Sequence, residues 1–570
     1  MSLNSQSYKL PDALQGEVKS SLADWKKGGK VKRLWQGDPL LWTGTDEDKW
    51  LGWLHITEQQ INDIAKLKEI AADVKSAGFR NALLLGMGGS SLCPEVLRLT
   101  FGTQPGHPNL HVLDSTDPAQ IRATEEKVDL ASTICIVSSK SGSTLEPNIY
   151  KQYFFERVKA KVGEKEAGAR FIAITDPGSK MQRVAEKDKF RRICMGVPSI
   201  GGRYSALSNF GMVPAAVMGI DVAKFLRSTQ EMVQACGENT DAGANPGVVL
   251  GTILGTAATH GRDKLTIVTS PGIFDLGAWL EQLIAESTGK TGTGIIPVDR
   301  EKLAAPGVYG NDRVFAYLCL QGDPDDGKSA ALDALAKAGH PVVRIVLPDI
   351  YSLGQEFFRW EIATAVAGAI LGINAFNQPD VEASKVETRK LTSEYESSGK
   401  LPPESPFFSD GLKLYADPRN TAELKGGGTL VGFLKKHLER IKSGDYFGVL
   451  GYITMNEEYQ AALQAIRLAV RDKKKVATVL GFGPRFLHST GQAYKGGPNS
   501  GVFLQITCDD AVDLLVPGQK YTFGVVKAAQ ARGDFAVLAE RGRRALRVHL
   551  GKDVAAGLAT LSDAIQQALG

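Results

Sequence analysis

Short apolar runs alternate along this chain with stretches of helical periodicity, and the alternation occurs three times. Strands flanked by helices in this way predict parallel sheets covered on both faces. A helical stretch over about 57–77 precedes the first alternation. Its expected strands lie near 81–85, 110–113, 132–138 and 171–175.

The second alternation starts after about residue 215, and the third follows a polar stretch near 388–410. In the second, we expect strands at 264–269, 313–319 and 342–347 and helices at 245–259, 277–286, 328–338 and 354–371. In the third, we expect strands at 446–453, 476–480 and 502–507 and helices at 429–442, 456–472 and 552–569. The pattern predicts an α/β protein with two tandem, doubly wound parallel-sheet units and a third C-terminal α/β unit.

These patterns also predict the boundaries of the segments. Residues 1–60 form a polar lead segment, and its tryptophans serve as packing anchors. The proline-containing residues 396–410 form a linker. The three units then occupy 61–215, 216–395 and 411–570.

Composition narrows the class of protein. The 570 residues are 43% hydrophobic and carry a net charge of +4, so we expect no bulk attraction to nucleic acid or to a membrane. We see no secretory signal in the first ten residues and no apolar run of the roughly 18 residues that a membrane span needs. The six cysteines lack C-x-x-C spacing and are expected to be reduced, buried thiols. We therefore expect a cytoplasmic protein.

Two loops of small residues, 86–91 and 138–144, each follow an apolar run and lead into a helix start. Glycine lets a backbone approach a ligand closely, and the N–H groups of a helix start point toward it. Hydroxyl side chains and Lys140 complete an anion cradle in the second loop, which predicts a phosphate on a small molecule. The competing interpretations are an ordinary tight turn at 86–91 and a solvated loop lysine at Lys140.

Four further blocks stand out, at 201–208, 282–290, 376–385 and 485–492. In their order along the chain, the loops and blocks resemble the glucose-6-phosphate isomerase (phosphoglucose isomerase) family. The resemblance is greatest to the isomerase half of bacterial fusions with transaldolase, and the matching blocks span about 80–385. It implies two flavodoxin-like sugar isomerase (SIS) domains. The first of them, 61–215, would bind phosphate, and the second, 216–395, would carry the catalytic glutamate and lysine.

The resemblance implies reversible isomerisation of D-glucose 6-phosphate to D-fructose 6-phosphate through a cis-enediolate. It implies no cofactor or metal, and it implies a homodimer. The substrate-binding residues that match the family are Gly89, Ser90, Ser139, Lys140, Ser141, Thr144, Gly202, Gln282 and Gln378. The catalytic residues that match are Glu286 as the base, Arg203 near the reacting carbons and Lys385 near the ring oxygen.

These residue types suit the chemistry. One carboxylate can take a proton from C2 and return it to C1, and Gln282 and Glu286, four residues apart, share one helix face. Arg203 is a fixed cation that can steady the developing oxyanion, while the distant phosphate supplies orientation. The structural alternatives are a surface role for Glu286 and Lys385, a brace between units for Arg203 and a helix cap for Gln378.

One departure from the family concerns ring opening. Members carry a histidine in a glycine-rich stretch after the glutamate, but here residues 307–313 contain none. Our hypothesis assigns this role to His488 in the third unit, backed by Lys385; the alternative is a structural loop histidine. Asn377 and Asp380 replace the family's Asp and Gly.

Other functions stay open at this point. One is isomerisation of a related sugar phosphate such as mannose 6-phosphate, and another is a non-catalytic SIS sensor. Transaldolase activity is not expected, because the lead segment is far shorter than a barrel of about 250 residues. We interpret Arg541, Arg543 and Arg544 as a solvated helix face in preference to an anion site. Three roles stay open for the third unit: it completes the active site, it contacts a second subunit, or it binds a regulator.

Overall fold

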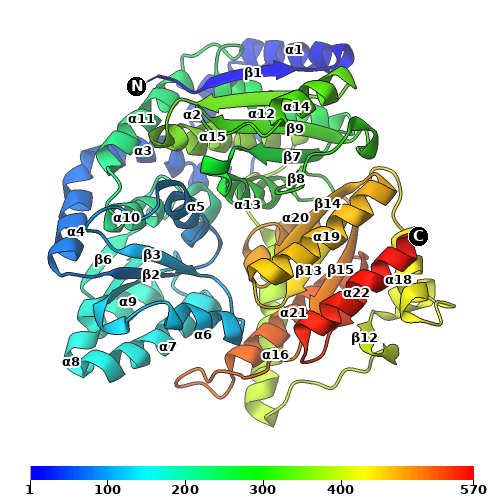
Figure 1. Ribbon diagram of the computed structural model, residues 1–570. Coiled ribbons are helices and arrows are strands. Elements are labelled where there is room, and N and C mark those ends of the chain that lie inside the picture. The colour runs from blue at the N-terminus through cyan, green and yellow to red at the C-terminus, as the bar shows by residue number, and fades with distance from the viewer. Residues whose placement is uncertain (1) are drawn as a thin grey trace.

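The computed structural model describes residues 2–570, which form three sheets flanked by helices (Figure 1). The first sheet is parallel and has the strand order β3-β2-β4-β5-β6. Its strands are β2 (Asn81–Leu85), β3 (Asn109–Leu113), β4 (Thr133–Ser138), β5 (Phe171–Thr175) and β6 (Arg192–Met195). The helices of this region are α3 (Ile56–Asn62), α4 (Ile64–Ser76), α5 (Leu92–Phe101), α6 (Pro118–Glu126), α7 (Leu145–Val162), α8 (Glu164–Ala167), α9 (Lys180–Lys187) and α10 (Asn209–Val217).

The second sheet has the order β1-β10-β9-β7-β8. Four of its strands are parallel: β7 (Lys264–Thr269), β8 (Ile296–Val298), β9 (Arg313–Leu320) and β10 (Val342–Leu347). Its helices are α11 (Val222–Ala235), α12 (Pro246–Thr259), α13 (Leu276–Thr288), α14 (Lys328–Lys337), α15 (Leu353–Leu371) and α16 (Pro379–Ser398).

The fifth strand of this sheet comes from the lead segment. β1 (Ser5–Lys9) pairs antiparallel with β10 and covers that edge, and α1 (Asp12–Lys27) and α2 (Lys30–Trp35) follow it. The indole N–H of Trp35 donates a hydrogen bond of 2.8 Å to the carbonyl oxygen of Cys236, the residue after α11. The indole N–H of Trp42 donates one of 2.8 Å to the carbonyl oxygen of Ala365 in α15. The tryptophans therefore anchor the lead segment to the second unit, but the short strand β1 was not predicted.

The third sheet has the order β11-β12-β16-β15-β13-β14. Its strands are β11 (Phe408–Asp410), β12 (Leu412–Tyr415), β13 (Tyr446–Tyr452), β14 (Ala477–Phe482), β15 (Gly501–Thr507) and β16 (Arg544–His549). Its helices are α17 (Pro418–Glu423), α18 (Leu430–Glu439), α19 (Glu457–Lys474), α20 (Gly491–Gly496), α21 (Phe523–Glu540) and α22 (Val554–Leu569). The last four strands are parallel to one another, as a doubly wound unit requires.

The predicted α/β fold class is confirmed, but two local interpretations were wrong. The polar stretch that starts near residue 388 begins as helix, because α16 runs to Ser398 and packs along α21. The arginine cluster is not a helix face. Arg541 follows α21, Gly542 turns the chain with a φ of 68°, and Arg544 begins β16, so Arg543 is buried at the junction.

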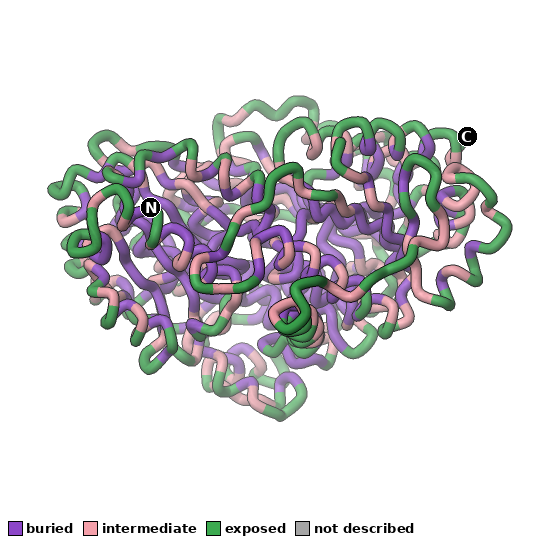
Figure 2. The backbone as a smooth tube through the Cα atoms, turned by 90° about the horizontal axis from the view of Figure 1, so that it is seen from below, coloured by how far each residue is buried: buried purple, intermediate pink, exposed green. Residues whose placement is uncertain are grey.

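One apolar core joins the lead segment to the first two units, and a separate core fills the third sheet. Seen from below, the buried stretches run through the middle and the exposed ones lie along the periphery (Figure 2). Among residues 2–570, no helix combines the length and the apolar character needed to cross a bilayer.

Candidate active site

All thirteen predicted site residues line one cavity of about 410 Å³. The loops after β2 and β4 line it, together with the turn at Gly201–Arg203. Helix α13, the start of α16 and the segment around His488 also line it. The cavity is therefore assembled from all three units.

The loop after β4 presents hydroxyl groups to this cavity. The side chains of Ser138 and Ser139 are buried, and their Oγ atoms have no hydrogen-bond partner within residues 2–570. Ser141 Oγ lies 2.8 Å from Ser143 Oγ. Lys140 also lines the cavity, but its ammonium donates to the Asp176 carboxylate and to a backbone carbonyl. The hydroxyls of Ser138 and Ser139 are thus free for a ligand, whereas the lysine is already engaged.

The loop after β2 needs its glycines because other backbone segments touch it on both sides. A Cβ atom on Gly89 would lie 1.9 Å from the carbonyl oxygen of Gly202. Gly88 has a φ of 56°, and a Cβ there would lie 2.7 Å from the carbonyl oxygen of His488. These glycines bring the first unit against both the arginine turn and the third unit.

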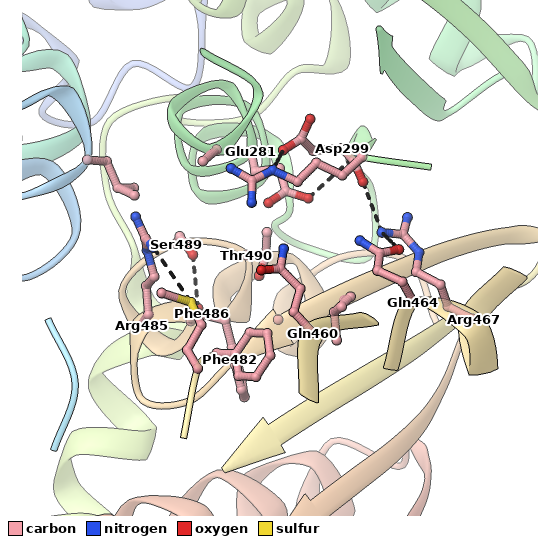
Figure 3. A pocket seen from close by; sticks show the side chains of 16 residues that line it. Glu281, Asp299, Gln460, Gln464, Arg467, Phe482, Arg485, Phe486, Ser489 and Thr490 are labelled. Atoms are coloured by element: carbon pink, nitrogen blue, oxygen red, sulfur yellow. Dashed lines mark hydrogen bonds and ion pairs between the residues drawn. The ribbon is translucent and has the colours of Figure 1, made fainter. Parts of the chain in front are cut away.

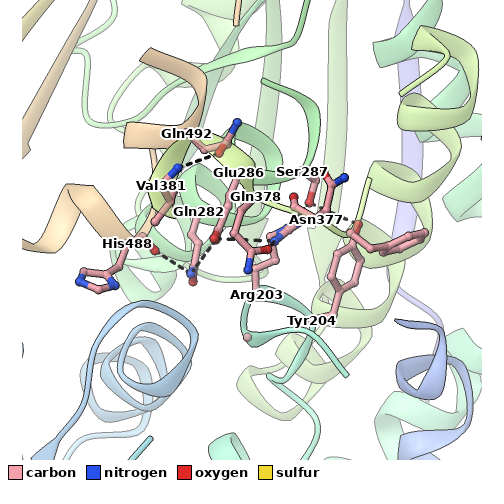
Figure 4. Close-up of polar contacts among 12 residues, drawn as sticks. Arg203, Tyr204, Gln282, Glu286, Ser287, Asn377, Gln378, Val381, His488 and Gln492 are labelled. Atoms are coloured by element: carbon pink, nitrogen blue, oxygen red, sulfur yellow. Dashed lines mark hydrogen bonds and ion pairs between the residues drawn. The ribbon is translucent and has the colours of Figure 1, made fainter. Parts of the chain in front are cut away.

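Glu286 and Gln282 point from α13 into the cavity (Figure 4). Gln282 Nε2 donates to Glu286 Oε2 at 3.1 Å and to the carbonyl oxygen of His488 at 2.8 Å. The Glu286 side chain is 10% exposed, and its Oε1 lies 3.7 Å from Arg203 Nη1. A single carboxylate thus faces the cavity with one amide donor and one cation beside it.

Arg203 is held in place on every side. Its Nε donates to Ser287 Oγ at 2.7 Å and its Nη1 donates to Gln378 Oε1 at 2.9 Å. Its Nη2 donates to the carbonyl oxygens of Ala375 and Asn377 at 2.8 and 3.0 Å. Because the side chain is only 1% exposed, this guanidinium is a fixed positive charge. It braces the two units and faces the cavity at the same time.

His488 pairs with Glu146, a residue that sequence reasoning missed. His488 Nε2 lies 2.9 Å from Glu146 Oε1, and Gln530 Nε2 donates to the same oxygen at 2.5 Å. Burial raises the pKa of Glu146, but the positive charge and hydrogen bond of His488 outweigh it, so the pKa lies below its ordinary value. The one available signal was an acidic residue in the first turn of the helix after the hydroxyl loop.

The start of α16, which carries Gln378 and Lys385, is held by the third unit. Gln492 Oε1 accepts hydrogen bonds from the backbone N–H groups of Asp380 and Val381, at 2.9 and 3.2 Å. Gln492 Nε2 donates to Asp380 Oδ2 at 2.8 Å. Asp380, which stands where the family has glycine, therefore has a hydrogen-bond partner in the third unit. Lys385 lines the cavity with a side chain that is 38% exposed and lies 3.4 Å from a Glu382 oxygen.

A smaller cavity of about 80 Å³ lies between α13 and the third unit (Figure 3). Glu281 lines it, and burial followed by the nearby charge of Asp299 raises the pKa of Glu281 to about 8. Among the described residues 2–570, those that line this cavity include none of the thirteen candidate residues. Neighbouring positions of α13 thus serve two different cavities.

The family profile described as phosphoglucose isomerase matches residues 59–311. A glucose-6-phosphate isomerase of Methanocaldococcus jannaschii is 28% identical over 342 residues, which are 54% of this chain and 83% of the relative. One from Rubrobacter xylanophilus is 29% identical over 364 residues, which are 56% of this chain and 83% of the relative.

Two solved structures share the fold. A hypothetical protein from Thermus thermophilus has a TM-score of 0.58 and 24% identity, and the match covers 67% of this chain and 99% of that one. A glucose-6-phosphate isomerase from Chlamydia trachomatis has a TM-score of 0.53 and 19% identity, with 67% and 86% covered. By its sequence, this chain is a relative of the phosphoglucose isomerases, with residues 59–311 as the matched region.

Proposed function

We propose that this chain interconverts D-glucose 6-phosphate and D-fructose 6-phosphate. The observation that carries the proposal is the single carboxylate, Glu286, which faces a cavity that also holds a fixed arginine and a loop with free hydroxyls. The name of the relatives supports this substrate pair.

The sugar phosphate enters with its phosphate against the loop after β4. There it accepts hydrogen bonds from the hydroxyls of Ser139, Ser141 and Thr144, all of which line the cavity beside the unpartnered Ser138. A charged acceptor satisfies such buried donors well. The phosphate is remote from the reacting carbons, so this contact mainly orients the sugar.

Glu286 then acts as the base. Its carboxylate removes the proton from C2 of the open-chain aldose, and the electron pair moves to form the enediolate. The same group returns the proton to C1, while a proton moves from the C2 oxygen to the C1 oxygen, so the ketose is an isomer and nothing is consumed. Arg203 stabilises the negative oxygen, because its position is fixed before the charge develops.

His488 opens the sugar ring in this proposal. The Glu146 carboxylate contacts the imidazole and orients it, so that His488 can donate a proton to the ring oxygen. Lys385 lines the same part of the cavity and supplies a second positive charge.

A coupled assay with fructose 6-phosphate tests the function. We expect turnover by the parent and a fall of about 10²- to 10⁴-fold in kcat for Glu286→Gln. Glu281→Gln, on the same helix, is the matched control, because Glu281 lines the other cavity. Equal activity of the parent and Glu286→Gln would refute the role of Glu286, and binding without turnover by the parent would favour the sensor.

Mannose 6-phosphate is the second substrate to assay, because discrimination depends on how the C2 hydroxyl is held. A kcat/KM for mannose 6-phosphate above that for glucose 6-phosphate would overturn the proposed substrate pair. The homodimer, the cytoplasmic location and the relation to the transaldolase fusions remain predictions from the sequence.

A further inference from the structure

A second large cavity, of about 550 Å³, adjoins the active site, and Asn377 lines both. The lead segment, the second unit and the third unit all contribute to its wall, through Thr43, Asn374 and Arg543 among others. Its lining contains one acidic side chain, that of Asp380. It contains four basic side chains, those of Lys290, Lys495, Arg541 and Arg543. The cavity is thus strongly cationic.

Two of these cations are buried without a counter-ion. Lys290 is 3% exposed, and its Nζ donates to the carbonyl oxygens of Ser287 and Asn374 at 2.9 and 2.5 Å. Arg543 is 5% exposed; its Nη2 donates to two carbonyl oxygens, and its Nε has no hydrogen-bond partner. Neither forms an ion pair with a carboxylate of residues 2–570.

Most other buried cations in this protein have counter-ions; within residues 2–570 Arg467, whose guanidinium donates to the carbonyl oxygens of Asp299 and Thr478, is an exception. Lys495 Nζ lies 2.6 Å from Asp534 Oδ1, and Arg313 Nη2 lies 2.9 Å from Glu301 Oε1, with all four side chains at most 1% exposed. A buried charge without a partner is costly, so folds normally supply one. Lys290 and Arg543 have no such partner within residues 2–570, so a negative charge from outside the chain could pair with them.

The ionisation of Lys290 agrees with this arrangement. Burial lowers the pKa of Lys290 well below its ordinary value, and the positive charge of Arg203 lowers it further. The negative charges of Glu286, Asp380 and Glu47 raise the pKa of Lys290 in the opposite direction, but none of them forms an ion pair with it. An anion in the cavity would restore the charged form of the lysine.

We propose that this cavity binds the phosphate group of a small molecule, with Lys290, Arg541 and Arg543 as its cationic ligands. Arg543 offers the unpartnered Nε, and Arg541, whose side chain is 42% exposed, reaches the cavity from its mouth. The rest of the lining is rich in hydroxyl and amide groups, which suit the hydroxyls of a phosphorylated polyol: Thr43, Thr45, Thr291, Asn374, Asn377 and Asn499.

This cavity shares structure with the active site. Asn377 lines both cavities, and its carbonyl oxygen accepts from Arg203. Arg541 Nη2 lies 3.1 Å from Asp380 Oδ1, and the other oxygen of Asp380 accepts from Gln492. An anion that draws Arg541 away from Asp380 would act directly on the start of α16.

Calorimetric titration with inorganic phosphate tests the site. We expect two phosphates per chain in the parent, one at the loop after β4 and one here. Arg541→Gln should weaken one of the two by at least about tenfold, because a charge-assisted contact is lost. Arg543→Met should abolish that site and leave the other.

Arg544→Gln is the matched control. Arg544 belongs to the same basic run but pairs with Asp445 at 2.6 and 2.9 Å and does not line the cavity. The Arg544→Gln variant should bind both phosphates as tightly as the parent does. Circular dichroism checks the fold of each variant, and Arg541→Gln keeps the test valid if Arg543→Met does not fold, since Arg541 is at the surface.

Crystals of the parent soaked in tungstate locate the second anion. A peak beside Lys290 and Arg543 that is missing in Arg541→Gln or Arg543→Met supports the proposal. A parent that binds no phosphate, or phosphate binding that both the Arg541 and the Arg543 variants retain with the affinity and stoichiometry of the parent, overturns it. The result does not depend on whether the chain is an isomerase.

Discussion

The two walls of the active-site cavity are built in different ways. The phosphate wall, formed by the loop after β4, is one continuous run of residues in which the hydroxyls of Ser138 and Ser139 lack partners. The proton-transfer wall consists of Glu286, Arg203 and His488, which come from three separate elements and are held by hydrogen bonds. One wall is ready to donate hydrogen bonds to a ligand, whereas the other fixes charges before a ligand arrives. The comparison predicts that damage to the first raises KM and damage to the second lowers kcat.

The largest effect is expected from Arg203→Met. The variant removes the cation beside Glu286 and leaves the carbonyl oxygens of Ala375 and Asn377 without their donor. We expect kcat to fall about 10³-fold and the free energy of unfolding to fall by about 3–5 kcal/mol. Steady-state kinetics and chemical denaturation measure the two losses. A normal kcat would show that this wall does not depend on a fixed positive charge.

His488→Ala should lower kcat by about tenfold to 100-fold with cyclic glucose 6-phosphate as substrate. The side chain contributes the imidazole, while the contact of its carbonyl oxygen with Gln282 persists in the variant. A substrate analogue that cannot close a ring should be isomerised at nearly the parent rate. Equal losses on the two substrates would assign His488 to proton transfer instead of ring opening.

The pairing of Glu146 with His488 also predicts a pH dependence. The pKa of Glu146 in the folded protein lies below its ordinary value of 4.5, so the pair stabilises the fold above about pH 4.5 and is lost as pH falls through the folded pKa. The Tm difference between the parent and Glu146→Gln should therefore be larger at pH 7 than at pH 4. A difference that grows on acidification contradicts the pair.

The smallest effect is expected on the phosphate wall. Ser141→Ala removes one neutral donor from a group of several, so KM should rise about tenfold and kcat should change little. Ser132→Ala, on the short turn before β4, is the control and should match the parent. A large fall in kcat for Ser141→Ala would erase the distinction between the two walls.

The sequence was most informative where function is local. The loop after β4 and the Gln282–Glu286 spacing lie within single elements, so their geometry follows from strand and helix periodicity. Edge strands such as β1 and β8 were missed, because three to five residues carry too little pattern and their pairing partners are distant. Arg541, Arg543 and Arg544 were interpreted as a solvated helix face, whereas Arg544 begins β16 and the fold buries Arg543.

Residues that act across units were the hardest to find. Glu146 and Gln492 work through partners more than 100 positions away, His488 and Asp380, and nothing in their local sequence indicates those partners. The departure at Asp380 was visible in the sequence, but its reason appears only when the third unit is placed against α16.

The carbonyl oxygen of His488 binds Gln282 and lies against Gly88, so the third unit supports the isomerase machinery with main-chain atoms. Alanine scanning leaves such atoms in place and would detect only the side-chain part of this unit's role, such as that of His488. The contribution of its main chain would emerge only when the peptide chain itself is shifted or cut, for example by inserting a residue directly before His488. A map drawn from side-chain replacements alone would therefore understate how much of this enzyme's geometry comes from beyond its family-matched region.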